Sequence, residues 1–425
     1  MAEPETIFDA RFRGFPPGMT SADASELGGM HLRPQDGRMS LPLLSLDRGA
    51  FTRNSQTLIG HLNAHGALLA PHAKTPMVPE LARRLVDAGA WGASVADIRQ
   101  AGVLADAGHK RLIIANQVGG MAAARRLAAR FAGRQEMELH VFVDSIEAVS
   151  ALRNAWDDRS DLPLLGLLIE VGGARAGLRD TAGATAVLDH ALAAERSGVY
   201  VSGSAAYEGA VASGTPEVAG RRVDELLDRL AGLHAAVREK VGPGRELIVT
   251  AGGSAWFDRV LARLGDLAHA PQTKLILRSG AIFFSDHGVY ERALEQMAKR
   301  SAHPEGRFAP ALRVWAEVLS TPETGLVICG MGIRDVSSDI DLPIPLAIWR
   351  DGKLIAEDPN AKVVKLNDQH AFLEVSKAAG DRLFRVGDVI EFGISHPCTC
   401  IDRHGVIWEV DDSGAAVGVL RTMFG

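Results

Sequence analysis

Apolar and polar positions alternate in blocks along the middle of the chain, a pattern that predicts buried strands followed by amphipathic helices. Apolar runs of strand length fall at residues 67–73, 93–98, 111–116, 139–143, 164–171, 198–203, 246–251 and 274–278. Helical periodicity fills the intervals, at residues 79–89, 98–107, 120–132, 146–156, 183–197, 216–240 and 254–264. Nearly continuous apolar strands are typical of parallel sheets that helices cover on both faces.

The number of these units favours a closed barrel over an open sheet. Eight predicted strands with helical connections, spread over roughly 230 residues, match the size of a (β/α)8 barrel. A doubly wound open sheet is the alternative, but it requires no such number of units, and no G-x-G-x-x-G follows the first strand. Before the barrel, the sequence predicts a short strand at Leu41–Leu44 and a helix that Asp47 caps and Gly66 ends.

After about residue 300 the pattern changes to short strands separated by turn signals. The predicted strands are residues 313–319, 325–329, 346–349, 353–356, 362–366, 371–375, 388–392, 406–410 and 415–422. Asp351-Gly352 and Ser413-Gly414 have the composition of hairpin turns. We therefore predict an α/β barrel with a second, mostly β domain. The boundaries are an N-terminal arm at 1–45 that packs on the β domain, the barrel at 46–300 and the β domain at 301–425.

Composition excludes several classes of protein. The 425 residues are 47% apolar and 23% charged, as in a folded two-domain protein. A net charge of −6 argues against binding to a phosphate backbone, and no apolar run approaches the roughly 20 residues of a membrane span. The acidic start lacks an apolar signal segment, and three cysteines make no disulfide framework. These features predict a cytoplasmic protein without a nucleic-acid or membrane partner.

Lys74 ends the first apolar run, in the sequence Pro71-His72-Ala73-Lys74-Thr75. Chemistry in α/β barrels collects at the C-terminal ends of the strands, where Lys74 is expected. A lysine in a dry site can lose its proton and react as a Schiff-base amine. A solvated loop lysine is the ordinary alternative, and the order of the downstream motifs is what argues against it.

Two glycine turns follow the seventh and eighth predicted strands. They are Gly252-Gly253-Ser254, which leads into a helix, and Arg278-Ser279-Gly280-Ala281. Glycine lets backbone N–H groups approach an anion closely, and barrels commonly hold phosphate in the loops after these two strands. A phosphate site that faces a lysine across a barrel mouth suggests pyridoxal 5′-phosphate.

With these motifs the chain resembles the fold-type III pyridoxal-phosphate enzymes, and within them the D-serine dehydratase and D-threonine aldolase branch. The resemblance covers about residues 40–420. Besides the lysine and glycine motifs, it is carried by Ile114-Ala115-Asn116, Val143-Asp144-Ser145, Gly203 with Tyr207-Glu208-Gly209, Gly280 to Asp286, Gln369-His370 and His396-Pro397-Cys398.

The resemblance implies roles for individual residues. Lys74 would hold the cofactor as a Schiff base, Arg175 would lie near its ring, and Tyr207 would line its pocket. The phosphate would be held by Gly252, Gly253, Ser254 and Gly280. For Arg175, a solvated loop position is an equal alternative.

His396 and Cys398 offer an imidazole and a thiolate, a donor pair that suits zinc. The intervening residue would let both side chains point to one face of an extended chain. Cys398 and Cys400 could instead be two ordinary buried thiols. By resemblance, the dehydratases have His-x-Cys here for zinc and the threonine aldolases have His-x-Asp for a manganese-type ion. His370 is either a helper near this metal or a structural histidine.

Some positions depart from the family pattern. Ala70 stands where the family usually has arginine, Cys329 where aspartate is common, and Ser204-Ala205 where glutamine is common. These positions affect the pocket wall and therefore the identity of the substrate. The chain also has only three tyrosines, none after Tyr290. Alanine racemases take a second base, a tyrosine, from the β domain, so a racemase of that kind is disfavoured.

Together these features predict a pyridoxal-phosphate- and zinc-dependent lyase that converts a D-3-hydroxy amino acid, D-serine foremost, to a 2-oxo acid and ammonia. The alternatives are a metal-dependent D-threonine aldolase and a non-catalytic pyridoxal-phosphate carrier. By resemblance we also expect a head-to-tail homodimer with active sites at the interface, in which His396 and Cys398 would serve the partner's Lys74.

Overall fold

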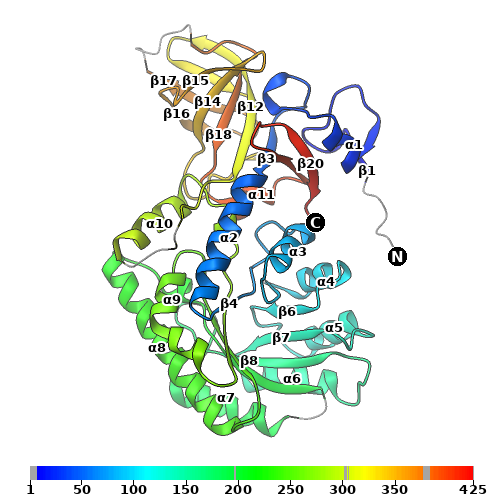
Figure 1. Cartoon of the computed structure of the whole chain (residues 1–425), viewed down its shortest axis with the longest axis vertical. Helices are drawn as coiled ribbons and strands as arrows, with labels where there is room; N and C mark the ends of the chain where they lie inside the picture. Colours follow the sequence, from blue (N-terminus) through cyan, green and yellow to red (C-terminus); the bar gives the residue numbers. More distant parts are fainter. Residues whose placement is uncertain (1–6, 196–197, 301–303, 305, 377–382, 425) are drawn as a thin grey trace.

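The computed structural model describes residues 7–195, 198–300, 304, 306–376 and 383–424. Its lower half in Figure 1 is a parallel barrel whose strands follow one another in the order β4-β11-β10-β9-β8-β7-β6-β5. The strands are β4 (Leu68–Leu69), β5 (Ala93–Val95), β6 (Arg111–Ile114), β7 (Glu138–Val143), β8 (Leu164–Glu170), β9 (Val199–Ala205), β10 (Leu247–Ala251) and β11 (Thr273–Leu277). The predicted barrel is confirmed.

The first strand is shorter than its apolar run predicts, yet the segment that follows it closes the barrel. β4 pairs with β11 through Leu68 and Leu69 only. Beyond β4, His72 forms a parallel bridge with Ser94 of β5, and the Ser94 amide donates to the Pro71 carbonyl at 3.0 Å. The segment that ends in the lysine motif is therefore pinned to both neighbouring strands.

Helices surround the barrel, and several of them begin at a side chain that caps the helix. They are α2 (Arg48–Ala64), α3 (Pro79–Asp87), α4 (Ile98–Asp106), α5 (Met121–Phe131), α6 (Ile146–Trp156), α7 (Thr181–Ala193), α8 (Pro216–Val241), α9 (Phe257–Leu264) and α10 (Val289–Arg300). Asp47, as predicted, accepts the Ala50 amide at the start of α2. The sequence pattern did not predict α10, and residues 196 and 197 of the predicted helix 183–197 lie outside the described residues.

The C-terminal part forms the upper half of Figure 1 and is mostly antiparallel. Its elements are β12 (Leu312–Glu323), β13 (Leu326–Cys329), β14 (Ile344–Arg350), β15 (Lys353–Glu357), β16 (Ala361–Leu366), β17 (Ala371–Val375), β18 (Val389–Gly393), α11 (Pro397–Ile401), β19 (Val406–Val410) and β20 (Ala416–Arg421). Asp351 and Gly352 both have positive φ, 49° and 74°, and form the predicted two-residue hairpin turn.

The N-terminal segment joins this β structure. β3 (Leu43–Asp47) pairs antiparallel with β12 and parallel with β19. The predicted boundary at residue 45 falls inside β3. The earlier elements β1 (Ile7–Asp9), β2 (Ser21–Asp23) and α1 (Ala24–Gly29) lie beside β20 in Figure 1, and Trp408 of β19 donates to the Arg13 carbonyl at 2.9 Å.

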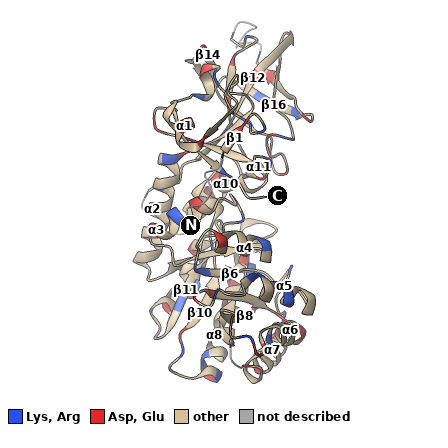
Figure 2. Cartoon of the chain, turned by 90° about the vertical axis from the view of Figure 1, so that its right-hand side faces the viewer, with Lys and Arg blue, Asp and Glu red and all other residues tan. Residues whose placement is uncertain are grey.

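Both signs of charge occur in each half of the molecule. In Figure 2, lysine and arginine are interspersed with aspartate and glutamate over both halves of the molecule. Within the described residues, no helix combines the length and the apolar character that crossing a bilayer requires.

Candidate active site

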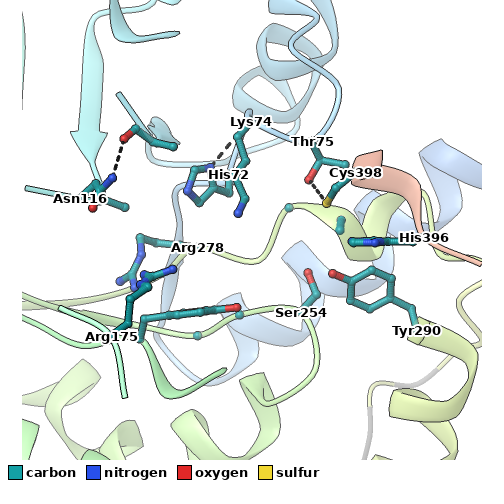
Figure 3. A pocket seen from close by; sticks show the side chains of 17 residues that line it. His72, Lys74, Thr75, Asn116, Arg175, Ser254, Arg278, Tyr290, His396 and Cys398 are labelled. Carbon is teal, nitrogen blue, oxygen red and sulfur yellow. Dashed lines mark hydrogen bonds between the residues drawn. The ribbon is translucent and has the colours of Figure 1, made fainter. Parts of the chain in front are cut away.

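A cavity of about 230 Å³ opens at the C-terminal ends of the barrel strands. All nine residues that the sequence assigned to the site line it: Lys74, Arg175, Tyr207, Gly252, Gly253, Ser254, Gly280, His396 and Cys398. Figure 3 shows Lys74, Arg175 and Ser254 reaching the cavity from the barrel loops, and His396 and Cys398 reaching it from the start of α11. The fold therefore gathers into one space residues that are more than 300 positions apart in the sequence.

The lysine loop is rigid around an exposed side chain. The Ala73 amide donates to the Ser94 carbonyl at 2.8 Å, and Thr75 is buried, whereas the Lys74 side chain is exposed on the cavity wall. His72 lies beside it. Burial, and then the charges of Lys74, Arg278 and Arg175, hold the pKa of His72 well below its usual value. His72 is therefore a neutral part of the wall.

The two glycine turns meet because β10 and β11 are paired neighbours, with Ala251 opposite Leu277. The amides of Gly252 and Gly253 donate to the buried carboxylate of Glu208, at 3.0 and 2.6 Å. Among the described residues, the amides of Ser254, Gly280 and Ala281 have no protein acceptor. A Cβ on Gly280 would lie 2.4 Å from the His72 carbonyl oxygen, so this turn fits against the lysine loop only as glycine.

Cationic side chains line the cavity near the barrel axis. The Arg175 guanidinium lies 5.0 Å from the centre of the Tyr207 ring. Arg278 is buried and donates to the Thr250 hydroxyl at 2.5 Å and the Ala206 carbonyl at 2.7 Å. Burial lowers its pKa from the usual value. Arg278 belongs to the motif Arg278-Ser279-Gly280-Ala281, but no role in the pocket was predicted for it from the sequence. Only long-range contacts turn its side chain inward.

His396 and Cys398 reach the cavity by a different route from the one predicted. They do not share one face of an extended chain, because Pro397 starts helix α11. His396 is the extended residue before the helix and Cys398 lies in its first turn. The His396 Nδ1 atom lies 2.7 Å from Asp339 Oδ2, and the Cys398 sulfur lies 3.2 Å from the Thr75 hydroxyl.

These contacts shift both side chains toward their charged forms. The hydrogen bond with Cys398, followed by that with Asp339, outweighs burial and raises the pKa of His396 to about 9. Burial alone would raise the pKa of Cys398, but the hydrogen bonds from His396 and Thr75 lower it overall. Cys400, in contrast, is fully buried, and burial raises its pKa to about 12. Cys400 is thus an inert thiol outside the cavity.

Tyr290 was counted in the sequence analysis but given no role, and it lines the cavity. It lies at the start of α10, where the Asp286 carboxylate accepts its amide at 2.8 Å. Burial raises the pKa of its hydroxyl well above the usual value, and Ser254 is its hydrogen-bond partner. The spacing of Tyr290, Leu294 and Met297 was the available helical signal.

Two expectations about the metal side require correction. His370 is exposed between β16 and β17 and does not line the cavity, so it is no helper at this site. His396 and Cys398 face the Lys74 of their own chain, because the sulfur contacts Thr75 directly. One chain therefore brings the lysine and the donor pair together without a partner subunit.

Comparisons with known proteins agree with this architecture. Residues 311–410 match the family model described as "Putative serine dehydratase domain". A D-threonine aldolase from an Arthrobacter species is 26% identical over 391 residues, which cover 89% of this chain and 93% of that protein. The structure of a D-threonine aldolase from Filomicrobium marinum is 23% identical, with a TM-score of 0.73, and the match covers 91% of this chain and 95% of that one.

A further structural relative is a D-threo-3-hydroxyaspartate dehydratase from a Delftia species. It is 20% identical with a TM-score of 0.69, and the match covers 91% of this chain and 98% of that one. Among its known variants are a histidine-to-alanine change and, two positions further on, a cysteine-to-alanine change in the metal-free form. The comparisons confirm the alanine-racemase-like fold and the resemblance stated from the sequence, and the aldolases and the dehydratase among these relatives are lyases.

Proposed function

We propose that this chain is a pyridoxal-phosphate- and zinc-dependent dehydratase of D-3-hydroxy amino acids, in line with its resemblance to the fold-type III enzymes. D-serine is the proposed substrate, and pyruvate and ammonia are the products. The observation that carries the proposal is the imidazole and thiol pair of His396 and Cys398 in the same cavity as Lys74. A lysine suited to a carbonyl cofactor and a donor pair suited to a soft metal serve one reaction only if they share a space.

The cavity fits pyridoxal phosphate. The unpaired amides of Ser254, Gly280 and Ala281 offer three donors to a phosphate, and Lys74 lies on the opposite side of the cavity from Ser254 in Figure 3. Glu208 occupies the amides of Gly252 and Gly253, which fixes the shape of this loop. Bound there, the cofactor supplies an electron sink that acidifies the Cα–H bond of an amino acid.

The cavity also fits a zinc ion with open coordination positions. His396 and Cys398 supply two donors, and no group of three or more His, Cys, Asp or Glu occurs in the described part of the chain to fill a metal's coordination sphere, so water or substrate would take the remaining positions. Catalytic zinc sites keep at least one position for water or substrate, whereas structural sites are filled by protein. Bound there, zinc supplies a Lewis acid that makes a substrate hydroxyl a better leaving group.

The chain's own residues divide the remaining work. The Lys74 amine, on the cavity wall, would take the Cα proton of a bound substrate. Arg175 and Arg278 supply positive charge near the barrel axis and orient anionic groups. Burial holds the pKa of His72 well below its usual value, which makes its imidazole a weak base. The overall change releases pyruvate and ammonia from serine with the atoms of the substrate alone.

A D-threonine aldolase is the second candidate, because relatives of that name cover most of this chain. An aldolase would break the Cα–Cβ bond of the same bound amino acid. Cys398 favours the dehydratase, since the Delftia dehydratase has variants at a histidine and a cysteine with the same spacing. A non-catalytic carrier is disfavoured, because a carrier needs neither the β domain nor the donor pair.

A product assay separates these candidates. Purified enzyme would be given D-serine or D-threonine, with ammonia and 2-oxo acid measured in one channel and glycine and aldehyde in the other. The proposal predicts ammonia with pyruvate from D-serine. Glycine with acetaldehyde from D-threonine, and no ammonia from either substrate, would instead establish the aldolase.

The domain limits, the cytoplasmic location and the homodimer remain predictions of the sequence and its resemblance. For the homodimer, sedimentation velocity at micromolar concentration is the direct measurement, and a protein sedimenting at about 45 kDa would contradict it.

A further inference from the structure

Asp339 faces the donor pair from the 330–343 segment that connects β13 to β14. One carboxylate oxygen lies 2.7 Å from His396 Nδ1, and the other accepts the Thr399 hydroxyl, also at 2.7 Å. Thr399 belongs to α11, the helix that carries Cys398. A single carboxylate therefore contacts the ring of one donor and the helix of the other.

The contact with His396 fixes which ring nitrogen is available to the cavity. A carboxylate accepts but cannot donate, so it places the proton on Nδ1. The lone pair of a neutral His396 is then on Nε2, the ring nitrogen that does not contact Asp339. Histidine ligands of metals commonly donate their other N–H to a carboxylate, which orients the ring and raises its basicity.

The position of Asp339 is itself held by neighbours that do not enter the cavity. The Ser395 hydroxyl donates to the Asp341 carbonyl at 2.8 Å, and the Asp341 amide lies 3.3 Å from the same hydroxyl. The segment around residues 339–341 thus runs beside residues 395–399 with hydrogen bonds at several positions. These hydrogen bonds fix the position of the Asp339 carboxylate, although Asp339 itself is partly exposed to solvent.

We propose that Asp339 is a positioning residue for the metal site, which holds His396 in the tautomer that ligates through Nε2 and fixes α11 through Thr399. The inference rests on the proposed function, because it assumes that His396 and Cys398 hold a zinc-class ion. Removing its carboxylate is expected to weaken metal binding without altering the pyridoxal-phosphate side of the cavity.

The test measures zinc affinity directly, by competition of the apoprotein with a chromogenic chelator. Asp339→Ala should bind zinc 10- to 100-fold more weakly, the range typical of lost partners around metal ligands. Asp339→Asn should be intermediate, because its amide oxygen can accept from His396 or Thr399 but not from both. The matched control is Asp341→Asn, which removes a carboxylate of the same segment that pairs with Arg292 instead.

A second readout separates positioning from damage to the fold. Turnover of Asp339→Ala should recover when zinc is raised in proportion to the lost affinity, and its cofactor absorption should match that of the wild type. Equal zinc affinity in wild type, Asp339→Ala and Asp339→Asn would overturn the inference. If Cys398→Ala also binds zinc as tightly as the wild type, the proposed metal site fails with it; if Cys398→Ala alone loses zinc, only the role of Asp339 fails.

Discussion

The two sides of the cavity are built by different means. The lysine and phosphate side consists of turns at the ends of barrel strands, and the pairing of β10 with β11 brings the two glycine turns together, with the Arg278 amide donating to the Gly252 carbonyl at 3.1 Å. The metal side consists of α11 and the irregular 330–343 segment, held together by side-chain hydrogen bonds such as Asp339 to His396. Backbone pairing therefore sets the cofactor side, whereas individual side chains set the metal side. Substitutions on the two sides should fail in different ways.

The largest expected effect is on the lysine side. Lys74→Ala should reduce turnover by about 10⁴-fold or more, because it removes both the Schiff-base amine and the proposed base. The visible absorption of the Schiff base between Lys74 and the cofactor should disappear, as recorded by spectrophotometry of the purified protein. Lys353→Ala, on exposed strand β15, serves as the control. A Lys74→Ala protein that keeps the absorption and the activity would remove the basis of the comparison.

On the metal side, Cys398→Ala should reduce turnover by about 10²-fold, because a metal ion that acts as a Lewis acid contributes several kcal/mol and the variant removes one of its ligands. The cofactor absorption should stay unchanged. Steady-state kinetics and zinc content measured on the same samples check this. Cys400→Ala is the matched control, because that thiol is buried outside the cavity. Loss of the cofactor absorption in Cys398→Ala would show that the two sides are not separable.

A smaller effect is expected at the contact of the two backbone turns. Gly280→Ala should cost about 1–3 kcal/mol of stability and weaken cofactor binding, because the new Cβ would meet the His72 carbonyl. Thermal unfolding and cofactor titration measure the two effects. Gly29→Ala at the end of α1 is the control, since its Cβ would meet nothing within 4 Å. A Gly280→Ala protein with wild-type cofactor affinity would argue against phosphate at this turn.

The smallest effect should come from the bond that joins the two sides. Thr75→Val keeps the shape of the side chain but removes the hydroxyl that lies 3.2 Å from the Cys398 sulfur. Losing one hydrogen bond worth about 1 kcal/mol should lower zinc affinity roughly fivefold. Thr75→Ser, which keeps the hydroxyl, should bind zinc as tightly as the wild type. Chelator competition would contradict this link if all three proteins bound zinc alike.

The cofactor side could be predicted because its signals are local. Each barrel strand is an apolar run buried on both faces, and the glycine turns follow two of these runs directly. Even so, the first strand has only two residues, since the chain bends after Leu69 and pairs with β5 through the His72 bridge. Helix α10 was missed because it buries little of its surface: Met297 is its only fully buried side chain among the described residues.

The metal side could be predicted only in part. The donors His396 and Cys398 were recognised from their types, but their geometry was not, because Pro397 ends the extended chain and begins a helix. Asp339 and Thr75 meet them across 57 and 323 residues of sequence. Contacts between residues so far apart leave no periodic pattern, so they could not be predicted from the sequence alone.

The most direct test of the account is ammonia release from D-serine by enzyme treated with a strong chelator, recorded together with the cofactor absorption. The account predicts that chelation abolishes pyruvate and ammonia while the absorption from the Lys74 side persists, and that added zinc restores turnover. Full turnover in the chelated enzyme, with no bound zinc, would contradict the account.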